Sequence, residues 1–298
     1  MSSQQQVFCL AWSSDGTRLA TGSQDHSIKL WTIGGDGGAD AVRADAELKG
    51  HTEAVMYMRW HPINSDRLAS TSSNERCIRF WDARVGKNTA TLSTPGHNLY
   101  LAWTGDGNYM AAGSKEDIVC AIDVRTMKIT GTVSYRYQIN ELGFLSKSGI
   151  LLQGTGKEGE IELLRWPEQT KIGSFAGHST SVLSLTVDRQ ENLIATGGAD
   201  ATCCVWDAKE FICTHSYYHM DYPVRALGFS YDSKYLAMVG EDPCVFVEDV
   251  QENKSLGRGL LRGSPEDCAW HPRRHILAYP YETYSDCFVE FRSLPDDA

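Results

Sequence analysis

The sequence has no long hydrophobic run and no excess of positive charge. Its apolar runs fall short of the roughly 18–20 residues that a membrane helix needs, so no membrane span is predicted. With 38 acidic and 28 basic residues, the formal net charge is −10. This charge makes the chain a poor electrostatic match for nucleic acid or for an anionic lipid surface. Bulk charge therefore argues against RNA or a membrane as a direct partner.

The sequence also lacks a Cys-x-x-Cys pair. Its nine cysteines are an odd number, so they cannot all pair within one chain. Several of them follow the acidic turns described below, where a free cysteine packs as a small apolar side chain. The N-terminal residues 1–6 show neither the basic region nor the apolar core of a secretory signal. We therefore expect a reduced protein of the cytosol or nucleus, without disulfides.

No arrangement of reactive residues matches a known catalytic or metal-binding motif. There is no His-Glu-x-x-His and no EF-hand loop, and the segment 154–159 lacks the spacing of a phosphate-binding loop. His178, Thr196 and Asp200 resemble a hydrolase triad in composition alone. The threonine hydroxyl is expected inside a sheet, whereas a nucleophile must be exposed beside an oxyanion hole. We expect no enzymatic activity, no cofactor and no bound metal.

The most informative segment is 177–207, which opens with a Gly-His pair and closes with a Trp-Asp pair. Two short apolar runs and a tight turn lie between the two pairs. This combination and spacing indicate one WD repeat. Buried polar groups need hydrogen-bond partners. We therefore expect a structural polar cluster made of His178, Thr196, Asp200 and Trp206.

An acidic residue recurs at the position of Asp200 along the whole chain, at spacings of 50, 41, 42, 42, 42 and 44 residues. Apolar residues follow three and five positions after each one, which is the period-2 pattern of a half-buried strand. The acidic positions are Asp25, Glu75, Glu116, Glu158, Asp200, Asp242 and Asp286. Strand-rich repeats of about 40–45 residues have the length of propeller blades. The sequence predicts an all-β fold: a single-domain, seven-bladed WD40 β-propeller.

The repeats divide the chain into seven blades at approximately 1–47, 48–91, 92–131, 132–174, 175–215, 216–258 and 259–298. The long first spacing is explained by a glycine-rich insert at 34–38, which we expect to be flexible. Blade 2 offers a second polar cluster with His51, Thr71 and Trp81. Its turn carries Glu75 where Asp is expected, and the longer side chain puts that cluster in question. Blade 4 departs furthest from the repeat.

Only three strands are visible in the sequence of blade 7. Propellers often complete the last blade with the N-terminal segment, but six residues before Val7 are barely enough for a connection and a strand. We expect a weak or absent fourth strand. Its open edge would then be a candidate docking site for a strand from a partner.

The residue just before each acidic turn is expected near the mouth of the central channel. The candidate partner-binding rim consists of Gln24, Asn74, Lys115, Lys157, Tyr222, Arg225 and Glu241. Lys115 and Lys157 lie on neighbouring blades and form either a small basic sector or scattered solvated charge. Tyrosines enrich the connection into blade 6, where they either anchor an interface or pack between blades.

Several stretches go beyond the generic repeat, because their departures from it fall in particular blades. They are Ile78–Arg84, Ala111–Asp117, Leu164–Glu168, Asp221–Ser230 and Ala269–Arg274. In these stretches the chain resembles the WD-repeat subunit family of the THO complex, its third subunit. The resemblance implies a non-enzymatic subunit of a nuclear assembly within the transcription-export (TREX) complex, which couples transcription to packaging and export of mRNA. It implies other THO subunits, elongated helical scaffold proteins, as partners, with RNA contacted at most indirectly.

The alternative is a generic WD40 adaptor that holds a short peptide over its central channel. A ubiquitin-ligase substrate receptor and a chromatin-tail reader belong to this class. The net charge of −10 suits basic peptides. The two hypotheses differ in the form of binding: a short peptide over the channel, or a large folded partner along one side.

Overall fold

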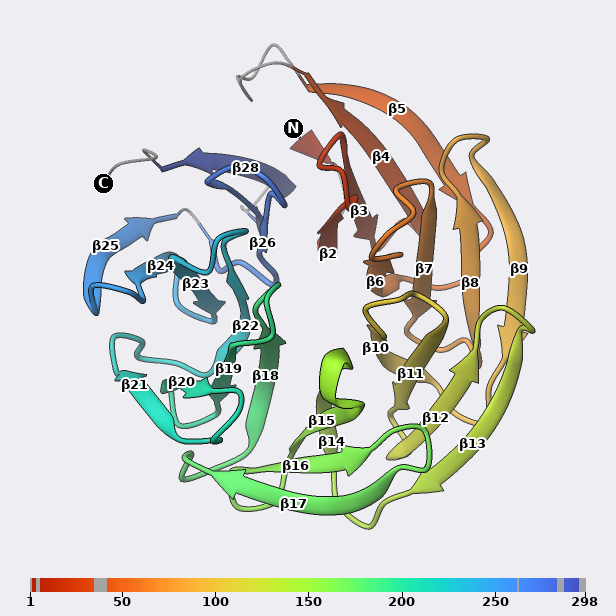
Figure 1. Cartoon of the computed structure of the whole chain (residues 1–298). Coiled ribbons are helices and arrows are strands. Elements are labelled where there is room, and N and C mark those ends of the chain that lie inside the picture. Colours follow the sequence, from red (N-terminus) through yellow and green to blue (C-terminus); the bar gives the residue numbers. More distant parts are fainter. Residues whose placement is uncertain (1, 4–5, 35–41, 262, 283–286, 295–298) are drawn as a thin grey trace.

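Seven four-stranded antiparallel sheets are arranged as blades around a common axis (Figure 1). This computed structural model describes residues 2–3, 6–34, 42–261, 263–282 and 287–294. Within those ranges there is no α-helix, and the only helical element is the 3-10 turn η2 (Ser146–Ser148). The prediction of an all-β, seven-bladed propeller is confirmed.

Each blade runs from an inner strand beside the axis to an outer strand at the edge of the molecule. The inner strands are β2 (Val7–Trp12), β6 (Val55–Trp60), β10 (Asn98–Trp103), β14 (Ile139–Leu145), β18 (Val182–Val187), β22 (Val224–Phe229) and β26 (Ala269–Trp270). The second strands are β3 (Arg18–Ser23), β7 (Arg67–Ser72), β11 (Tyr109–Ser114), β15 (Ile150–Thr155), β19 (Leu193–Gly198), β23 (Tyr235–Gly240) and β27 (Ile276–Glu282). The third strands are β4 (Ser27–Ile33), β8 (Cys77–Asp82), β12 (Ile118–Asp123), β16 (Glu160–Arg165), β20 (Cys203–Asp207), β24 (Cys244–Asp249) and β28 (Cys287–Ser293). The outer strands are β5 (Val42–Lys49), β9 (Lys87–Ser93), β13 (Lys128–Ser134), β17 (Thr170–Ala176), β21 (Cys213–Tyr217), β25 (Lys254–Leu260) and, in blade 7, β1 (Ser2–Ser3).

Blade 7 does have a fourth strand, and it comes from the N-terminal end of the chain (Figure 1). β1 pairs antiparallel with β28, placing Ser2 opposite Phe288 and Ser3 opposite Cys287. Of the two expected alternatives, an absent strand is wrong and a weak strand is correct, because β1 is only two residues long. Because the chain itself pairs with this edge, we do not propose it as a docking site. The seventh acidic position, Asp286, and most of the glycine-rich insert lie outside the described residues.

The hydrophobic core lies between blades rather than inside any one of them. Buried apolar side chains form seven clusters, and each cluster combines residues of two neighbouring blades. One of them joins blade 7 to blade 1 through Val7, Leu19 and Ile276. Both faces of every sheet are therefore covered, and the ring closes as one domain.

Tight turns connect the second and third strands and carry the recurring acidic residues. In four blades the residue after the acidic one has a positive φ: His26 (66°), Asp117 (56°), Gly159 (67°) and Ala201 (61°). Such left-handed residues reverse the chain within a short hairpin. The reversal brings the acidic side chain back toward the loop that enters the same blade, where the polar clusters form.

Four inner strands end in a tryptophan whose indole N–H donates to a backbone carbonyl of the preceding blade. The bonds run from Trp12 to Ala269, from Trp60 to Ala11, from Trp103 to Arg59 and from Trp270 to Gly228, with N–O distances of 3.1, 2.9, 3.3 and 2.9 Å. A buried indole N–H needs an acceptor, and these bonds supply one while tying each blade to the blade before it.

Candidate functional site

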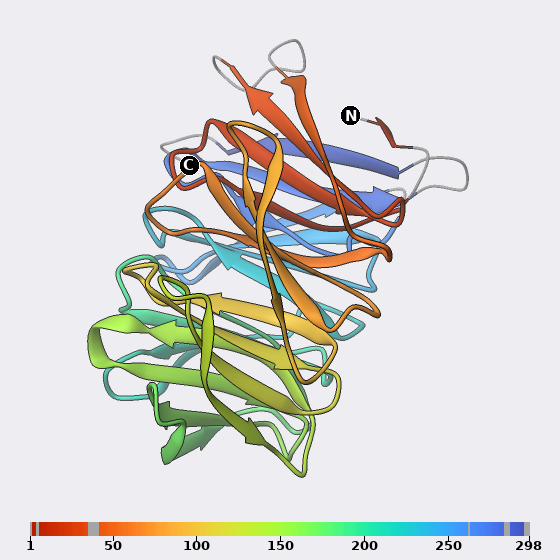
Figure 2. The same ribbon diagram turned by 90° about the vertical axis from the view of Figure 1, so that its right-hand side faces the viewer.

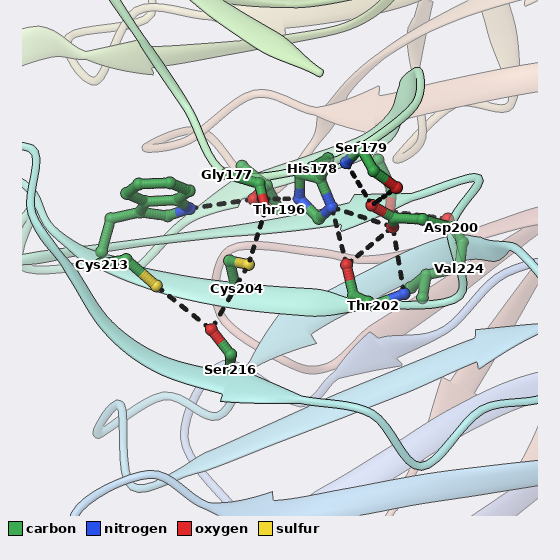
Figure 3. Close-up of polar contacts among 12 residues, drawn as sticks. Gly177, His178, Ser179, Thr196, Asp200, Thr202, Cys204, Cys213, Ser216 and Val224 are labelled. Atoms are coloured by element: carbon green, nitrogen blue, oxygen red, sulfur yellow. Dashed lines mark hydrogen bonds and ion pairs between the residues drawn. The ribbon is translucent and has the colours of Figure 1, made fainter. Parts of the chain in front are cut away.

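Figure 3 shows the polar cluster of blade 5. His178 lies in the loop between β17 and β18, Thr196 lies on β19 and Trp206 on β20. The indole N–H of Trp206 donates to the Thr196 hydroxyl at 2.9 Å, and Nε2 of His178 lies 2.8 Å from the same oxygen. Nδ1 of His178 lies 3.1 Å from Oδ1 of Asp200. The structure thus brings the four side chains into one continuous chain of hydrogen bonds.

Asp200 fixes the turn to the loop that carries the histidine. Its Oδ2 accepts the backbone N–H of Ser179 at 2.7 Å, and its Oδ1 accepts the Thr202 hydroxyl at 2.7 Å. Burial favours the neutral acid, but the hydrogen bonds from Thr202 and Ser179 outweigh it and hold the pKa of Asp200 below its ordinary value. Thr196 is fully buried, so its hydroxyl cannot reach a substrate. The geometry is that of a structural cluster and not of a hydrolase triad.

Blade 2 builds a similar chain, with one residue different from the expected set. Trp81 donates to the hydroxyl of Ser70 at 2.8 Å, and Nε2 of His51 lies 2.7 Å from that oxygen. Thr71, which the sequence pattern indicated, is not part of this chain. Its buried hydroxyl has no hydrogen bond within the described part of the structure. The segment between Ser70 and Glu75 is one residue longer than its counterpart in blade 5, so counting back from the acidic residue identifies the wrong side chain.

Glu75 completes the blade 2 cluster despite its extra methylene group. One carboxylate oxygen contacts Nδ1 of His51, and the other accepts the backbone N–H of Thr52 at 2.9 Å. Burial raises the pKa of Glu75, but the bonds from His51, Thr52 and Arg79 together hold the pKa well below its ordinary value. The doubt raised by the longer side chain is therefore unfounded.

Blade 4 replaces the whole cluster with a different set that sequence reasoning missed. Both carboxylate oxygens of Glu162 accept from the hydroxyl of Tyr137 at 2.8 Å. Gln153 donates to Glu162 at 3.2 Å, and Lys171 reaches it at 2.8 Å. One signal was available: Glu162 stands in the middle of a strand whose two faces are both covered, so its carboxylate needs buried partners.

Five of the seven expected rim residues lie in equivalent turns between the second and third strands, on one face of the propeller. All five are exposed: Gln24, Asn74, Lys115, Lys157 and Glu241. Of the two lysines, Lys157 has a carboxylate nearby, because its ammonium lies 3.9 Å from Glu160. Glu116 adjoins Lys115 in the sequence, but its carboxylate pairs with His97 and Arg76.

Three exposed apolar side chains lie in the segments that enter and end blade 6. Tyr218 and Tyr222 lie in the loop between β21 and β22, and Leu260 ends β25; their exposed fractions are 70%, 52% and 74%. The loop is anchored because Tyr217 and Met220 are buried in the core between blades 5 and 6. We call Tyr218, Tyr222 and Leu260 the blade 6 surface.

Of the two remaining rim residues, Tyr222 belongs to the blade 6 surface and Arg225 follows it on β22. Arg225 and Glu241 form an exposed ion pair with a nitrogen–oxygen distance of 2.8 Å. The backbone N–H of Tyr222 lies 3.2 Å from the carboxylate of Asp242, which holds the loop against the acidic turn of blade 6. Apolar anchors beside a polar, charged rim are the composition of many protein interfaces.

A cavity of about 720 Å³ follows the propeller axis and is lined by residues of all seven inner strands or the segments next to them. Charged and phenolic groups face it, among them Arg59, Glu141 and Asp267. The hydroxyl of Tyr57 in blade 2 donates to Glu141 in blade 4 at 2.9 Å, passing in front of blade 3. The guanidinium of Arg59 stacks over the Tyr57 ring, 4.1 Å from its centroid.

Neither metal-binding nor membrane-spanning features are seen in the ranges that the structure describes. No three His, Cys, Asp or Glu side chains there are placed to hold an ion. No helix in those ranges has the length and apolar character needed to cross a bilayer. The eight cysteines whose side chains the structure describes are free thiols.

Comparison with known proteins agrees with this architecture. The model of the family described as "WD domain, G-beta repeat" matches residues 2–32, 44–82 and 169–207. The three matched segments end in blades 1, 2 and 5. In each of these blades the indole N–H of a tryptophan on the third strand donates to a hydroxyl on the second strand. The family model therefore recognises the blades that keep the polar pair.

Three relatives show how far the likeness extends. THO complex subunit 3 of Arabidopsis thaliana is 30% identical over 276 residues, which cover 93% of this chain and 86% of that protein. WD repeat-containing protein AAC3 of Dictyostelium discoideum is 24% identical over 92% of this chain and 61% of its own length. Protein FIZZY-RELATED 3 of Arabidopsis thaliana is 25% identical over 68% of this chain but only 33% of its own length. Because the likeness to the first spans nearly all of both proteins, the chain belongs to the THO complex subunit 3 family of WD40-repeat proteins.

Proposed function

We propose that this protein is a non-enzymatic scaffold subunit of a nuclear THO assembly. In that role it supports packaging of messenger ribonucleoprotein and export of mRNA coupled to transcription, as part of the TREX complex. The observation that carries the proposal is the likeness to THO complex subunit 3 over 93% of this chain and 86% of the relative. The proposed partners are the other THO subunits, elongated helical proteins, and the proposed location is the nucleus.

The arrangement of polar groups supports binding rather than catalysis. Hydroxyls and carboxylates that could do chemistry are used inside the blades, as Thr196 and Glu162 illustrate. The remaining functional groups lie on the surface, where they can contact another protein. Any contact with RNA is proposed to be indirect, since the net charge of −10 disfavours a polyanion.

We propose the blade 6 surface as the principal docking site for a THO subunit. Tyrosine and other large apolar side chains dominate the binding energy of protein interfaces when a partner excludes water from them. The anchored loop holds Tyr218 and Tyr222 in place, so little conformational entropy is lost on binding. The Arg225–Glu241 pair and Asp221 supply the polar border.

Affinity purification of the tagged, full-length protein from nuclease-treated nuclear extract tests the proposed function. Stoichiometric recovery of the large THO subunits by mass spectrometry is the expected result. Recovery of cullin-linked or histone-modifying proteins without THO subunits would overturn the proposal in favour of a WD40 adaptor. Loss of THO subunits after nuclease treatment would show that RNA, and not protein contact, holds the complex.

Three sets of substitutions locate the docking site in the same assay. Tyr218→Ala with Tyr222→Ala and Leu260→Ser should reduce THO recovery at least tenfold. The matched control is Ile212→Ser, an exposed apolar residue (62%) in the turn between β20 and β21. A third variant, Lys115→Glu with Lys157→Glu, tests the basic sector. Undiminished recovery with the first variant would exclude the blade 6 surface without affecting membership of the assembly.

A further inference from the structure

Besides the exposed Glu266, two carboxylates line the axial cavity, and one of them is only partly hydrogen-bonded. Glu141 on β14 is 8% exposed. Its Oε1 accepts both the hydroxyl of Tyr57 at 2.9 Å and the backbone N–H of Leu142 at 3.0 Å. Its Oε2 has no hydrogen bond within the described residues and is not among the fully buried polar atoms there, so it is open to the cavity that Glu141 lines. A carboxylate oxygen that is open to a cavity and has no donor from the protein can accept an N–H from a bound group.

The other carboxylate belongs to Asp267, just before β26, and it is fully engaged. It accepts the backbone N–H of Leu10 at 3.0 Å and that of Cys268 at 2.8 Å. Arg59 on β6 contributes the nearby positive charge. Its guanidinium donates to the carbonyl of Met58 at 3.1 Å and to the hydroxyl of Tyr57. It makes no ion pair with either carboxylate among the described residues, although it is close enough to act on both electrostatically.

Counting charges leaves this cluster one positive charge short. A single guanidinium faces two carboxylates, and an unpaired charge in a buried site is costly. The deficit is met by a proton: burial raises the pKa of Glu141 to about 7, with Arg59 acting in the opposite direction but not cancelling it. The proton is therefore held only partly at neutral pH and can be exchanged for another positive charge.

The other groups that face the cluster do not supply that charge. Burial raises the pKa of the Tyr57 and Tyr100 phenols and of the Cys9 and Cys268 thiols, so all four stay neutral near neutral pH. Arg225, at the border of the cavity, is paired with Glu241. Arg189 donates to the carbonyl of Pro272 at 3.0 Å and is not among the charges that act most strongly on Glu141 or Asp267. Glu266 adds only negative charge.

We propose that the axial cavity is a binding site for one protonated amine or guanidine group, whose positive charge replaces the proton on Glu141. The unpartnered Oε2 accepts its N–H, and the rings of Tyr57 and Tyr100, 5.9 Å apart between centroids, offer aromatic surface to the cation. At about 720 Å³ the cavity has room for a lysine or arginine side chain with its flanking backbone, or for a small free amine. This site is independent of docking at the blade 6 surface.

Titration calorimetry of the purified full-length chain tests the site with N-acetyl-arginine methylamide. Its citrulline counterpart is the matched neutral control, because it has the same shape without the charge. The arginine probe should bind at least tenfold more tightly than the citrulline probe. Its affinity should rise about tenfold from pH 6 to pH 8 as Glu141 loses its proton, while the probe stays charged throughout. Equal affinity of the two probes would overturn the proposal, as would failure of the arginine probe to bind at 10 mM, roughly the weakest useful affinity.

Two variants and a third probe complete the experiment. Glu141→Gln keeps an acceptor for Tyr57 but removes the charge, so it should weaken the arginine probe at least tenfold and abolish the pH dependence. Glu210→Gln, an exposed carboxylate in the turn between β20 and β21 and outside the cavity, should change neither. Unchanged binding by Glu141→Gln would refute the assignment. Butylamine distinguishes the two sources of the bound cation. An affinity for butylamine equal to that for the arginine probe indicates a free amine as the ligand, and a much weaker affinity indicates a side chain within a peptide.

Discussion

At the scale of single residues, a serine or threonine on the second strand accepts a hydrogen bond from a tryptophan on the third strand in three different blades. Thr21, Ser70 and Thr196 accept the indole N–H at 3.0, 2.8 and 2.9 Å. In blades 2 and 5 the same oxygen also meets a histidine. The hydroxyl and the tryptophan therefore depend on each other, because removing either leaves a buried polar group without a partner.

Replacing Trp206 with alanine should destabilise the protein by about 3–5 kcal/mol, as for other truncations of large core side chains. Trp206 is buried between blades 4 and 5, so the substitution leaves a cavity and removes the donor to Thr196. Urea unfolding monitored by circular dichroism measures the change. We expect partner binding to fall only as far as the unfolded fraction rises. A folded variant with an unaltered melting curve would rule out the structural role.

Substitutions of the neighbouring blade 2 residues Ser70 and Thr71 should have opposite effects on the stability of the protein. Ser70→Ala removes the oxygen shared by Trp81 and His51 and should cost about 1–3 kcal/mol. Thr71→Val replaces a buried hydroxyl that has no partner in the described structure, so it should be neutral or stabilising. The same unfolding assay compares both variants. The reverse order of stabilities would mean that the sequence count, with Thr71 in the cluster, was right after all.

Glu141→Gln should change how stability depends on pH. The pKa of Glu141 is about 7 in the folded protein, whereas the ordinary value of a glutamate, expected in the unfolded chain, is 4.5. The folded state therefore binds the proton more tightly, and the wild type should lose stability as pH rises from about 4.5 to 7. The variant cannot ionise, so it should gain stability relative to wild type at pH 8 but not at pH 4. Parallel curves for the two proteins would contradict the assignment of this titration to Glu141.

The sequence predicted these residue contacts only where the repeat is regular. The cluster of blade 5 follows from one well-formed repeat, because each type of side chain has a fixed offset. Thr71 was assigned incorrectly because one extra residue in a hairpin shifts every earlier position. Glu162 was missed because its partners, Tyr137 and Lys171, come from parts of the blade that no offset connects to it.

At the scale of the strand and its loops, the Gly-His pair has a steric explanation. A Cβ atom at Gly177 would lie 2.4 Å from the Trp206 ring, and one at Gly50 would lie 3.1 Å from the Trp81 ring. The loop that delivers the histidine must pass directly over the tryptophan of the same blade. Only glycine allows that approach in blade 5, while blade 2 is slightly more open.

Alanine substitutions at the two glycines should therefore differ in severity. Gly177→Ala forces the Trp206 ring to move and should cost about 1–3 kcal/mol, in the range of overpacked cores. Gly50→Ala needs only a small adjustment and should cost less. Denaturant midpoints of both variants, measured with the same m-value, check the order. Equal losses would show that steric contact with the ring does not decide the choice of glycine.

The loop between β21 and β22 shows what the sequence could not decide at this scale. Its tyrosines were visible, but whether each anchors an interface or packs between blades depends on how the loop lies. The structure answers through Tyr217 and Met220, which turn inward and leave Tyr218 and Tyr222 outside. No periodic pattern encodes that choice, since the loop belongs to neither a strand nor a helix.

At the scale of the whole molecule, the number of blades could be read from the spacing of acidic turns alone. The closure of the ring could not, because β1 lies at the opposite end of the sequence from its partner β28. Figure 2, which views the molecule from the side, shows the blades following one another in chain order. The order of blades is local information, whereas the closing contact is long-range.

The protein should unfold in a single cooperative transition. Every hydrophobic cluster is shared by two blades, so losing one blade exposes the apolar faces of both neighbours. Scanning calorimetry should give a van't Hoff enthalpy equal to the calorimetric enthalpy. Two resolved transitions would mean that part of the ring is stable without the rest.

The polar clusters, in contrast, are each confined to one blade, and this separation has an evolutionary consequence. Blade 4 has a different set of hydrogen-bonded side chains, Tyr137, Gln153 and Glu162. The sheet register places Glu162 at the position of Cys204, and Leu164 at the position of Trp206. A change confined to one such set leaves the neighbouring blades' own hydrogen bonds untouched. Each repeat can accumulate substitutions at its own rate, so a propeller of this family can acquire a new partner through one divergent blade while the others keep the ancestral repeat.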